Sequence, residues 1–216
     1  VICKYTDIAK VFPDVIWHTE KPILRTAPAP LYLLSKLVRD SGIKVVLTGE
    51  GADEVLAGYD IFKEAKIRRF WAKMPDSKFR PTLLRRLYPY LPALQTQSKF
   101  YLEAFFNAGT SELSDEFFSH LPRWNTTAKI KEFFSSDVKG VLNGYNSVEE
   151  MRTTLGVDFS KWDWLSKAQY IEATKLLLGY ILSSHGDRMA MANSVEGRFP
   201  FLDHRVVEFS CAIPPN

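Results

Sequence analysis

The apolar pattern at the start of the chain predicts a strand, a helix and a second strand. The apolar run at residues 11–18 is short and rich in β-branched and aromatic residues, which favours a buried strand. After a loop containing prolines, four apolar residues recur at helical spacing from Pro30, and this predicts a helix that ends near Ser41 and Gly42. The continuous apolar run of residues 43–48 is typical of a strand buried on both faces of a parallel sheet. These three elements predict a βαβ unit and an α/β fold.

The remainder of the chain has a mainly helical pattern. We expect a long helix over residues 54–74, buried at Leu56, Phe62, Ile67, Phe70 and Trp71. Short amphipathic runs broken by Pro, Gly, Asn and Ser predict a helical region over residues 75–164. Another helix is expected over 165–184, followed by a dense polar motif. The predicted organisation is a partial α/β domain at 1–74, a helical region at 75–164, and a return to the α/β core at 165–216.

Composition narrows the class of protein without assigning a function. The 216 residues are 46% hydrophobic and 25% charged, with a formal net charge of +3, as in ordinary globular proteins. Neither this charge nor any apolar run indicates a nucleic acid or a membrane as partner. Cys3 and Cys211 show no metal-ligand or disulfide pattern, so we expect a reducing, cytoplasmic location. The chain begins at Val1 without a signal peptide, and we interpret it as an internal fragment.

The most informative local sequence is TGEGADE, residues 48–54, between the second strand and the following helix. Ligands of open α/β sheets bind at the carboxyl ends of strands, and Gly49 and Gly51 permit close backbone approach to an anion. The acids Glu50, Asp53 and Glu54 suit Mg²⁺ bound to phosphates. An alternative is that the acids only complement the helix macrodipole. No Lys-Ser or Lys-Thr follows the glycines, which excludes a Walker A loop.

A second charged motif lies near the end of the chain, around an expected short helix. It contains Asp187, Arg188, Glu196 and Arg198 among apolar residues, so we expect some of these charges to pair in the interior. The alternative is direct contact with a substrate. Asp203, before a helix-like run, is interpreted as an N-cap.

Basic residues interleaved with aromatic ones occupy the middle of the chain. They are Lys63, Lys66, Arg68, Arg69, Lys73, Lys78, Arg80, Arg85 and Arg86. A nucleic-acid surface is one interpretation, and a solvated helical face is the simpler one. The four histidines share no metal-ligand spacing, and no nucleophile elbow is present.

The two motifs together resemble a known family. The segments VVLTGEGADEVLAGYD and DRMAMANSVEGRFPFLDHRVVEF, in this order, are similar to the carboxy-terminal domain of glutamine-dependent asparagine synthetases. This resemblance implies an adenine-nucleotide α-hydrolase-like (PP-loop) parallel sheet that binds ATP and Mg²⁺. It further implies activation of aspartate to β-aspartyl-AMP with release of pyrophosphate. Ammonia from a separate glutaminase domain then yields asparagine, and a homodimer is a possible assembly.

The resemblance also assigns expected roles to residues of the first motif. Glu50 resembles the acid near ammonia and the aspartyl-AMP, and Asp53 resembles the carboxylate that binds Mg²⁺ and pyrophosphate. Thr48, Gly49 and Gly51 would shape the nucleotide site, and Tyr59 would approach the pyrophosphate. Arg25 and Thr26 lie near a threonine and an arginine that some members place on the activated phosphate, out of register by about one residue.

Several family features are missing, and this leaves alternatives open. The SGGxDS pyrophosphate loop, the amino-terminal cysteine of the glutaminase domain and the lysine-bearing segment after PFLDHR are absent from the chain. His185 stands where many members have Lys or Arg, and Ala52 where some have Ser. We therefore expect the fragment to be inactive alone. A related enzyme acting on another acid, such as a β-lactam synthetase, a noncatalytic interaction domain and a nucleic-acid module remain alternatives.

Overall fold

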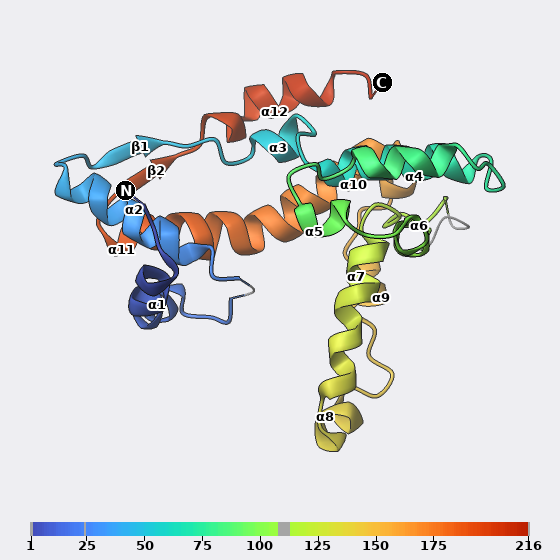
Figure 1. Ribbon diagram of the computed structural model, residues 1–216. Coiled ribbons are helices and arrows are strands. Elements are labelled where there is room, and N and C mark those ends of the chain that lie inside the picture. The colour runs from blue at the N-terminus through green and yellow to red at the C-terminus, as the bar shows by residue number, and fades with distance from the viewer. Residues whose placement is uncertain (1, 24, 108–112, 216) are drawn as a thin grey trace. The chain divides into compact units, whose positions relative to one another are not determined.

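The computed structural model describes residues 2–23, 25–107 and 113–215 (Figure 1). They form two units, one of Val1–Gly58 with Gln169–Asn216 and one of Tyr59–Ala168. The first unit contains α1 (Tyr5–Thr19), α2 (Pro28–Asp40), β1 (Val45–Leu47), α3 (Ala52–Val55), the π-helix η4 (Glu172–Asp187), α11 (Arg188–Ala192), β2 (Glu196–Arg198), the 3₁₀ helix η5 (Pro200–Leu202) and α12 (His204–Cys211).

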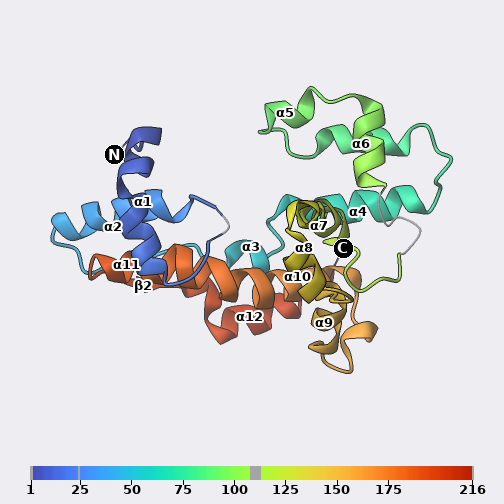
Figure 2. The same cartoon turned by 90° about the horizontal axis from the view of Figure 1, so that it is seen from below.

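The core of the first unit lies between α1, α2 and α11. Val15, Ala29 and Met189 are each 0% exposed and form its centre. A polar joint fixes α2 to α11, because Ser35 Oγ donates to the Met189 carbonyl at 2.7 Å and Asn193 Nδ2 donates to the Tyr32 carbonyl at 3.1 Å. Figure 2 shows α1 lying across these helices. This helical layer supports the two strands.

The strands β1 and β2 form a parallel pair, in which Val46 is opposite Gly197. The expected strand at residues 43–48 is confirmed as β1, but it is not buried on both faces, because Leu47 is 74% exposed. Among the described residues β1 pairs with one strand only, so the sheet is too small for both of its faces to be covered. The fold of this unit is therefore α/β, with a small parallel sheet and many helices.

The prediction of a strand at residues 11–18 is wrong. This segment belongs to α1, where Ile8, Val11, Phe12 and Val15 recur at helical spacing and pack into the core. The expected βαβ unit is replaced by a helix pair, α1 and α2, that precedes β1. The helix expected from Pro30 is confirmed as α2, with Gly42 after it at a φ of 80°.

The predicted helix at 54–74 is interrupted. The chain leaves α3 at Leu56 and passes through Ala57, whose φ is 57°, before the next helix starts at Asp60. Phe62 and Trp71 are buried as expected and Ile67 is partly buried, but Leu56 is 52% and Phe70 is 45% exposed. The left-handed conformation at Ala57 separates Leu56 from α4. Phe70, within α4, lies on the side that faces the guanidinium of Arg80.

The second unit consists of short helices, as the broken amphipathic pattern predicts. They are α4 (Asp60–Ala72), the 3₁₀ helix η1 (Arg80–Arg86), α5 (Pro92–Gln95), α6 (Lys99–Phe106), α7 (Leu121–Ala128), the 3₁₀ helix η2 (Lys129–Phe133), α8 (Ser136–Val141), α9 (Ser147–Thr153), the 3₁₀ helix η3 (Phe159–Lys161) and α10 (Trp164–Ile171), which ends in the first unit. Trp71, Leu84, Leu87, Leu102 and Phe106 form its main cluster. The helix expected at 165–184 is confirmed as α10 followed by η4.

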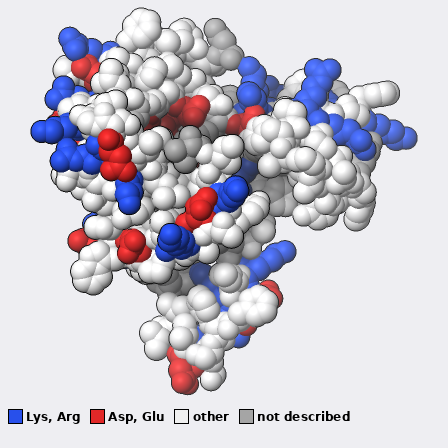
Figure 3. All heavy atoms as spheres, turned by 60° about the vertical axis from the view of Figure 1, so that its left-hand side comes forward, with Lys and Arg blue, Asp and Glu red and all other residues white. Residues whose placement is uncertain are grey.

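The basic run of the second unit is not one solvated face. Arg68 is 0% exposed and donates to the carbonyls of Phe106, at 2.9 Å, and Phe118, at 2.8 Å. Arg80 stacks on Phe70, with 4.1 Å from its guanidinium carbon to the ring centroid. On the face drawn in Figure 3, Lys and Arg side chains occur in several separate groups. Within the described part of the chain, no helix has the length and apolar composition needed to cross a membrane.

Candidate functional site

The turn after β1 is fixed by a glycine that no other residue can replace without strain. Gly51 has a φ of 90°, and a Cβ there would overlap the side chain of Leu202 in η5. The Ala52 amide donates to the Gly49 carbonyl at 3.1 Å, and the Val55 amide donates to the Gly51 carbonyl at 2.9 Å. The first motif is thus folded tightly against the PFL segment of the second.

Side chains from other elements donate hydrogen bonds to the last carbonyl groups of the short helix α3. Gln169 Nε2 donates to the carbonyls of Glu54 and Val55, both at 2.9 Å, and Ser210 Oγ of α12 donates to the same Val55 carbonyl. These bonds satisfy carbonyls that a helix of one turn leaves unpaired. The turn therefore has a defined position even though α3 is too short to be stable alone.

A pocket of about 270 Å³ lies next to this turn. Most of its lining is apolar and comes from α2, β1, α11 and the β2 region: Leu31, Leu34, Val38, Val46, Leu47, Ala190, Val195 and Phe199. Gly186 and Gly197 also line it, and its polar residues are Ser35, Thr48, Glu50 and Asp187. An apolar pocket with a few convergent polar groups is typical of a small-molecule site.

Two polar side chains of this pocket, those of Glu50 and Thr48, are in surroundings that suit them to bind a ligand or transfer a proton. Burial raises the pKa of the Glu50 carboxyl, and the charges of Glu54 and then Asp53 raise it further. Thr48 Oγ1 is buried and forms no hydrogen bond with any described residue. A carboxyl whose pKa moves toward neutrality is suited to accept and release a proton. The buried hydroxyl is suited to bind a polar ligand atom.

The other predicted residues of the first motif lie away from this pocket. Asp53 is exposed and its side chain is directed toward Gly58, where a Cβ would overlap Asp53 Oδ1. Gly49 is also exposed, and Tyr59 belongs to the second unit, where its ring lies 6.2 Å from that of Phe62. No three His, Cys, Asp or Glu side chains in residues 2–23, 25–107 and 113–215 converge as a metal site. A Mg²⁺ ion bound mainly by phosphates needs only one or two carboxylates.

The charges of the second motif pair at the surface, which corrects the expectation of interior pairing. Arg198 Nε lies 2.8 Å from Glu196 Oε1, and their side chains are 61% and 57% exposed. Two residues apart on a strand, they project from the same face, and little covers that face. Arg188 Nη1 bonds to the carboxylate of Glu20 at 2.8 Å and to the Thr19 carbonyl at 2.5 Å.

Comparison with known proteins places these motifs in a family. The model of the family described as asparagine synthase matches residues 1–216. The chain belongs to the asparagine synthase family. The match covers both motifs and the helical region between them.

Individual relatives of this family cover nearly the whole chain. Amidase chyE of Penicillium rubens is 30% identical over 97% of the chain, and asparagine synthetase [glutamine-hydrolyzing] 1 of Bacillus subtilis is 29% identical over 94%. Amidase chry2 of Gibberella zeae is 27% identical over 95%. The chain spans about 30% of the length of these relatives. No solved structure is significantly similar to it.

Two further residues that the family resemblance suggested, Arg25 and Thr26, are exposed and do not line the pocket. Burial lowers the pKa of nearby His185, a hydrogen bond at Ala27 opposes this, and the charge of Arg25 lowers it further. Asp203 is confirmed as an N-cap, since its Oδ1 accepts from the Arg205 amide at 2.9 Å. Hydrogen bonds from Arg205 lower the pKa of Asp203.

Sequence reasoning missed that α2 contributes to the pocket. The apolar face of Leu31, Leu34 and Val38 was visible as a helical pattern, but such a pattern is equally typical of a core-facing helix. Phe199 was also missed, although it follows Arg198 directly. A Cβ on Gly197 would lie 3.2 Å from Phe199 Cζ, so this glycine leaves room for the ring.

Proposed function

We propose that this chain forms part of the synthetase half of an enzyme that uses ATP to activate a carboxylic acid and then amidates it. In the asparagine synthetase form, the aspartate β-carboxylate attacks the α-phosphorus of ATP. This gives β-aspartyl-AMP and pyrophosphate, and ammonia derived from glutamine displaces AMP to give asparagine. A PP-loop type of parallel sheet, extended beyond β1 and β2, is part of this proposal. The main support is that Glu50 and Thr48 line one pocket at the carboxyl end of β1.

Glu50 has the central chemical role in this proposal. Its raised pKa and its place on the wall of an apolar pocket suit a base that takes a proton from ammonia as the new C–N bond forms. Thr48 Oγ1 and the backbone amides of the turn would bind phosphate oxygens.

Asp53 fits the role of a single carboxylate ligand to Mg²⁺, because it is exposed and lies beside the turn. When bound, the ion would neutralise charge on the pyrophosphate leaving group. Asp187, on the wall of the pocket that Glu50 and Thr48 line, would contact the substrate. In this arrangement the carboxylates of the first motif have separate functions in metal binding and proton transfer.

A second candidate is amidation of an acid other than aspartate. It is favoured by the relatives named amidase and by a pocket whose lining is mostly apolar. Both candidates share the adenylation step and differ only in the acid.

The experiment uses the full-length protein with ATP and glutamine. We expect pyrophosphate and asparagine to appear when aspartate is supplied, and the absence of both would contradict the first candidate. An ATP–pyrophosphate exchange assay with a panel of acids separates the two candidates, because exchange with another acid and not with aspartate supports only the second.

A further inference from the structure

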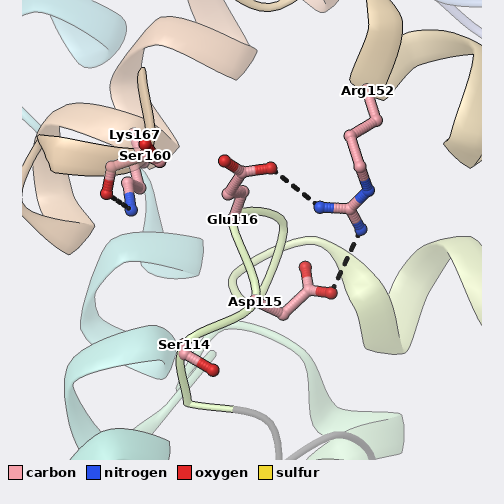
Figure 4. A pocket seen from close by; sticks show the side chains of 6 residues that line it. All are labelled: Ser114, Asp115, Glu116, Arg152, Ser160 and Lys167. Carbon is pink, nitrogen blue, oxygen red and sulfur yellow. Dashed lines mark hydrogen bonds and ion pairs between the residues drawn. The ribbon is translucent and has the colours of Figure 1, made fainter. Parts of the chain in front are cut away.

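The second unit contains an open polar pocket of about 380 Å³ that has no part in the proposed synthetase chemistry. Its lining comes from the loop before α7, from α9 and from the η3–α10 segment, and consists of Ser114, Asp115, Glu116, Arg152, Ser160 and Lys167 (Figure 4). Three separate chain segments thus bring charged side chains to one cavity.

One side of the pocket is built around Arg152. Its Nη1 donates to Glu116 Oε2 at 2.8 Å and its Nη2 to Asp115 Oδ2 at 3.2 Å. The guanidinium carbon lies 4.8 Å from the centroid of the Phe117 ring, which supports it from behind. Burial lowers the pKa of Arg152, but the bonds to Glu116 and Asp115 outweigh it and the pKa rises. The side chains of Asp115 and Glu116 are only 17% and 21% exposed, so most of their surface is covered by protein.

The other side of the pocket presents Lys167. Its Nζ donates to the Ser160 carbonyl at 2.7 Å and lies 6.0 Å from the Phe159 ring centroid. An ammonium group has three donors, so two N–H bonds of Lys167 remain for another acceptor. No carboxylate within the described ranges forms an ion pair with it. In the view of Figure 4, Glu116 stands between Arg152 and the Lys167–Ser160 pair.

The charges of the lining decide which ligands fit. Among the lining residues, Asp115 and Glu116 balance Arg152 and Lys167. Glu149, which does not line the cavity, lies 3.5 Å from Arg152 Nε and adds one negative charge behind it, so the pocket has no cationic excess. A polyphosphate needs a cationic excess, and a divalent cation needs several convergent carboxylates. A pocket with an unpaired cation on one side and acidic oxygens on the other is complementary to a dipolar ligand of zero net charge.

We propose that this pocket binds a small zwitterion of the α-amino-acid type. The ligand carboxylate accepts hydrogen bonds from Lys167 Nζ, and the ligand ammonium donates to Glu116 Oε1, since Oε2 of that carboxylate is held by Arg152. Ser114 and Ser160 also line this cavity. This site is separate in its residues from the proposed synthetase pocket.

The test measures glycine binding to the full-length protein by saturation-transfer NMR, with acetate and methylammonium as half-ligands. We expect saturable glycine binding, with either half-ligand weaker by about tenfold because one charged hydrogen bond is lost. Lys167→Met should weaken glycine binding by a similar factor. Lys161→Met is the matched control, because this lysine is 77% exposed, pairs with Asp158 and lies outside the pocket.

Several outcomes would overturn the proposal. Acetate binding as tightly as glycine would indicate a plain anion site, and no glycine binding would indicate an ion-pair cluster with a structural role only. Equal glycine binding by Lys167→Met, with an unchanged circular dichroism spectrum, would also contradict it. Loss of glycine binding in Glu50→Gln would assign that binding to the proposed synthetase pocket. If Glu50→Gln retains it, the inference stands independently of the proposed function.

Discussion

Each unit of the molecule contains a partly or fully buried glutamate, and the charges next to the two glutamates have opposite signs. In the first unit, Glu50 lines a pocket and has Glu54 and Asp53 as charged neighbours. In the second unit, Glu64 is 0% exposed and is surrounded by cations and a phenol. Its Oε2 accepts from Arg123 Nη2 and from the Tyr88 hydroxyl, both at 2.7 Å, and Arg68 Nη1 lies 3.9 Å from its Oε1.

Both glutamates are at least partly buried, and they differ in the charge of their neighbours. Burial lowers the pKa of Arg68 to about 10, while Glu64 acts in the other direction, so the guanidinium stays charged at neutral pH. Burial and the charge of Glu64 raise the pKa of Tyr88, which keeps its proton. The Glu64 cluster is therefore a set of compensated charges that joins α4, α7 and Tyr88, which follows η1.

The direction of the Glu50 pKa shift determines how its ionisation affects stability. Its pKa is higher in the folded chain than in the unfolded chain, so the folded state binds more protons between those two values. Stability therefore falls as the pH rises through that window, and the folded chain is less stable with Glu50 ionised. An acid that lowers stability when ionised and lines a pocket, as Glu50 does, is a candidate catalytic group. Glu64, paired with cations in the interior, is a candidate structural group.

The largest expected effect is a loss of activity in Glu50→Gln with almost no change in stability. Glu50→Gln keeps the size of the side chain but removes the proton acceptor, so we expect amide formation to fall by about 10²–10⁴-fold. The free energy of unfolding at neutral pH should be unchanged or rise by less than about 1 kcal/mol, because an unfavourable charge is removed. Both are measured on the full-length protein, by product formation and by urea denaturation.

Glu208→Gln is the control for this variant, since Glu208 is an exposed residue of α12. It should retain both activity and stability. If Glu50→Gln kept its full rate of amide formation, the proposed role of Glu50 would be wrong.

The next effect tests cohesion in the second unit. Glu64→Gln leaves Arg68 buried without its carboxylate, and we expect a loss of about 3–5 kcal/mol in the free energy of unfolding. Lys63→Met on the same helix removes a surface pair whose lysine is 66% exposed, and it should cost less than about 0.5 kcal/mol. Equal stability of the two variants in urea would show that the Glu64 cluster is not cohesive.

The sequence predicts some of these features because their causes are local. α2 has helical spacing and a proline at its start, β1 is an apolar run, and the Asp203 cap needs only its own helix. The buried pair of Glu64 and Arg68 was also visible, since residues four apart share a helical face, but both lie in a run of basic residues that suggested solvent.

Other features have causes that no local pattern contains. β2 consists of Glu196, Gly197 and Arg198, and it is a strand only because its backbone pairs with β1. Residues 11–18 have the composition of a strand, and they fold as a helix because Val15 reaches a core made with α2 and α11. The pocket beside Glu50 likewise depends on α2 packing against the turn, so the sequence predicted the turn but not most of the lining.

A smaller effect concerns the backbone that positions Glu50. Gly51→Ala introduces a Cβ at a φ of 90° and against Leu202, so we expect a loss of about 1–3 kcal/mol in stability. Gly49→Ala is the matched control in the same turn, because nothing lies within 4 Å of a Cβ there. Thermal and urea denaturation measure both. Adding Leu202→Ala to Gly51→Ala should recover part of the loss, and no recovery would mean that the overlap with Leu202 is unimportant.

The smallest effect tests why Glu50 differs from Glu64. After burial, the charge of Glu54 is the largest cause of the raised pKa of Glu50, so Glu54→Gln should lower that pKa. If Glu50 must be ionised for amide formation, the acidic limb of the pH–rate profile moves to lower pH, by less than about one unit. The limb remains above the usual range of a glutamate, because the burial of Glu50 is unchanged. Glu208→Gln should leave the limb in place. A limb that stays in place or moves to higher pH in Glu54→Gln would show that the Glu54 charge does not raise the pKa of Glu50. The contrast between Glu50 and Glu64 would then rest on burial alone.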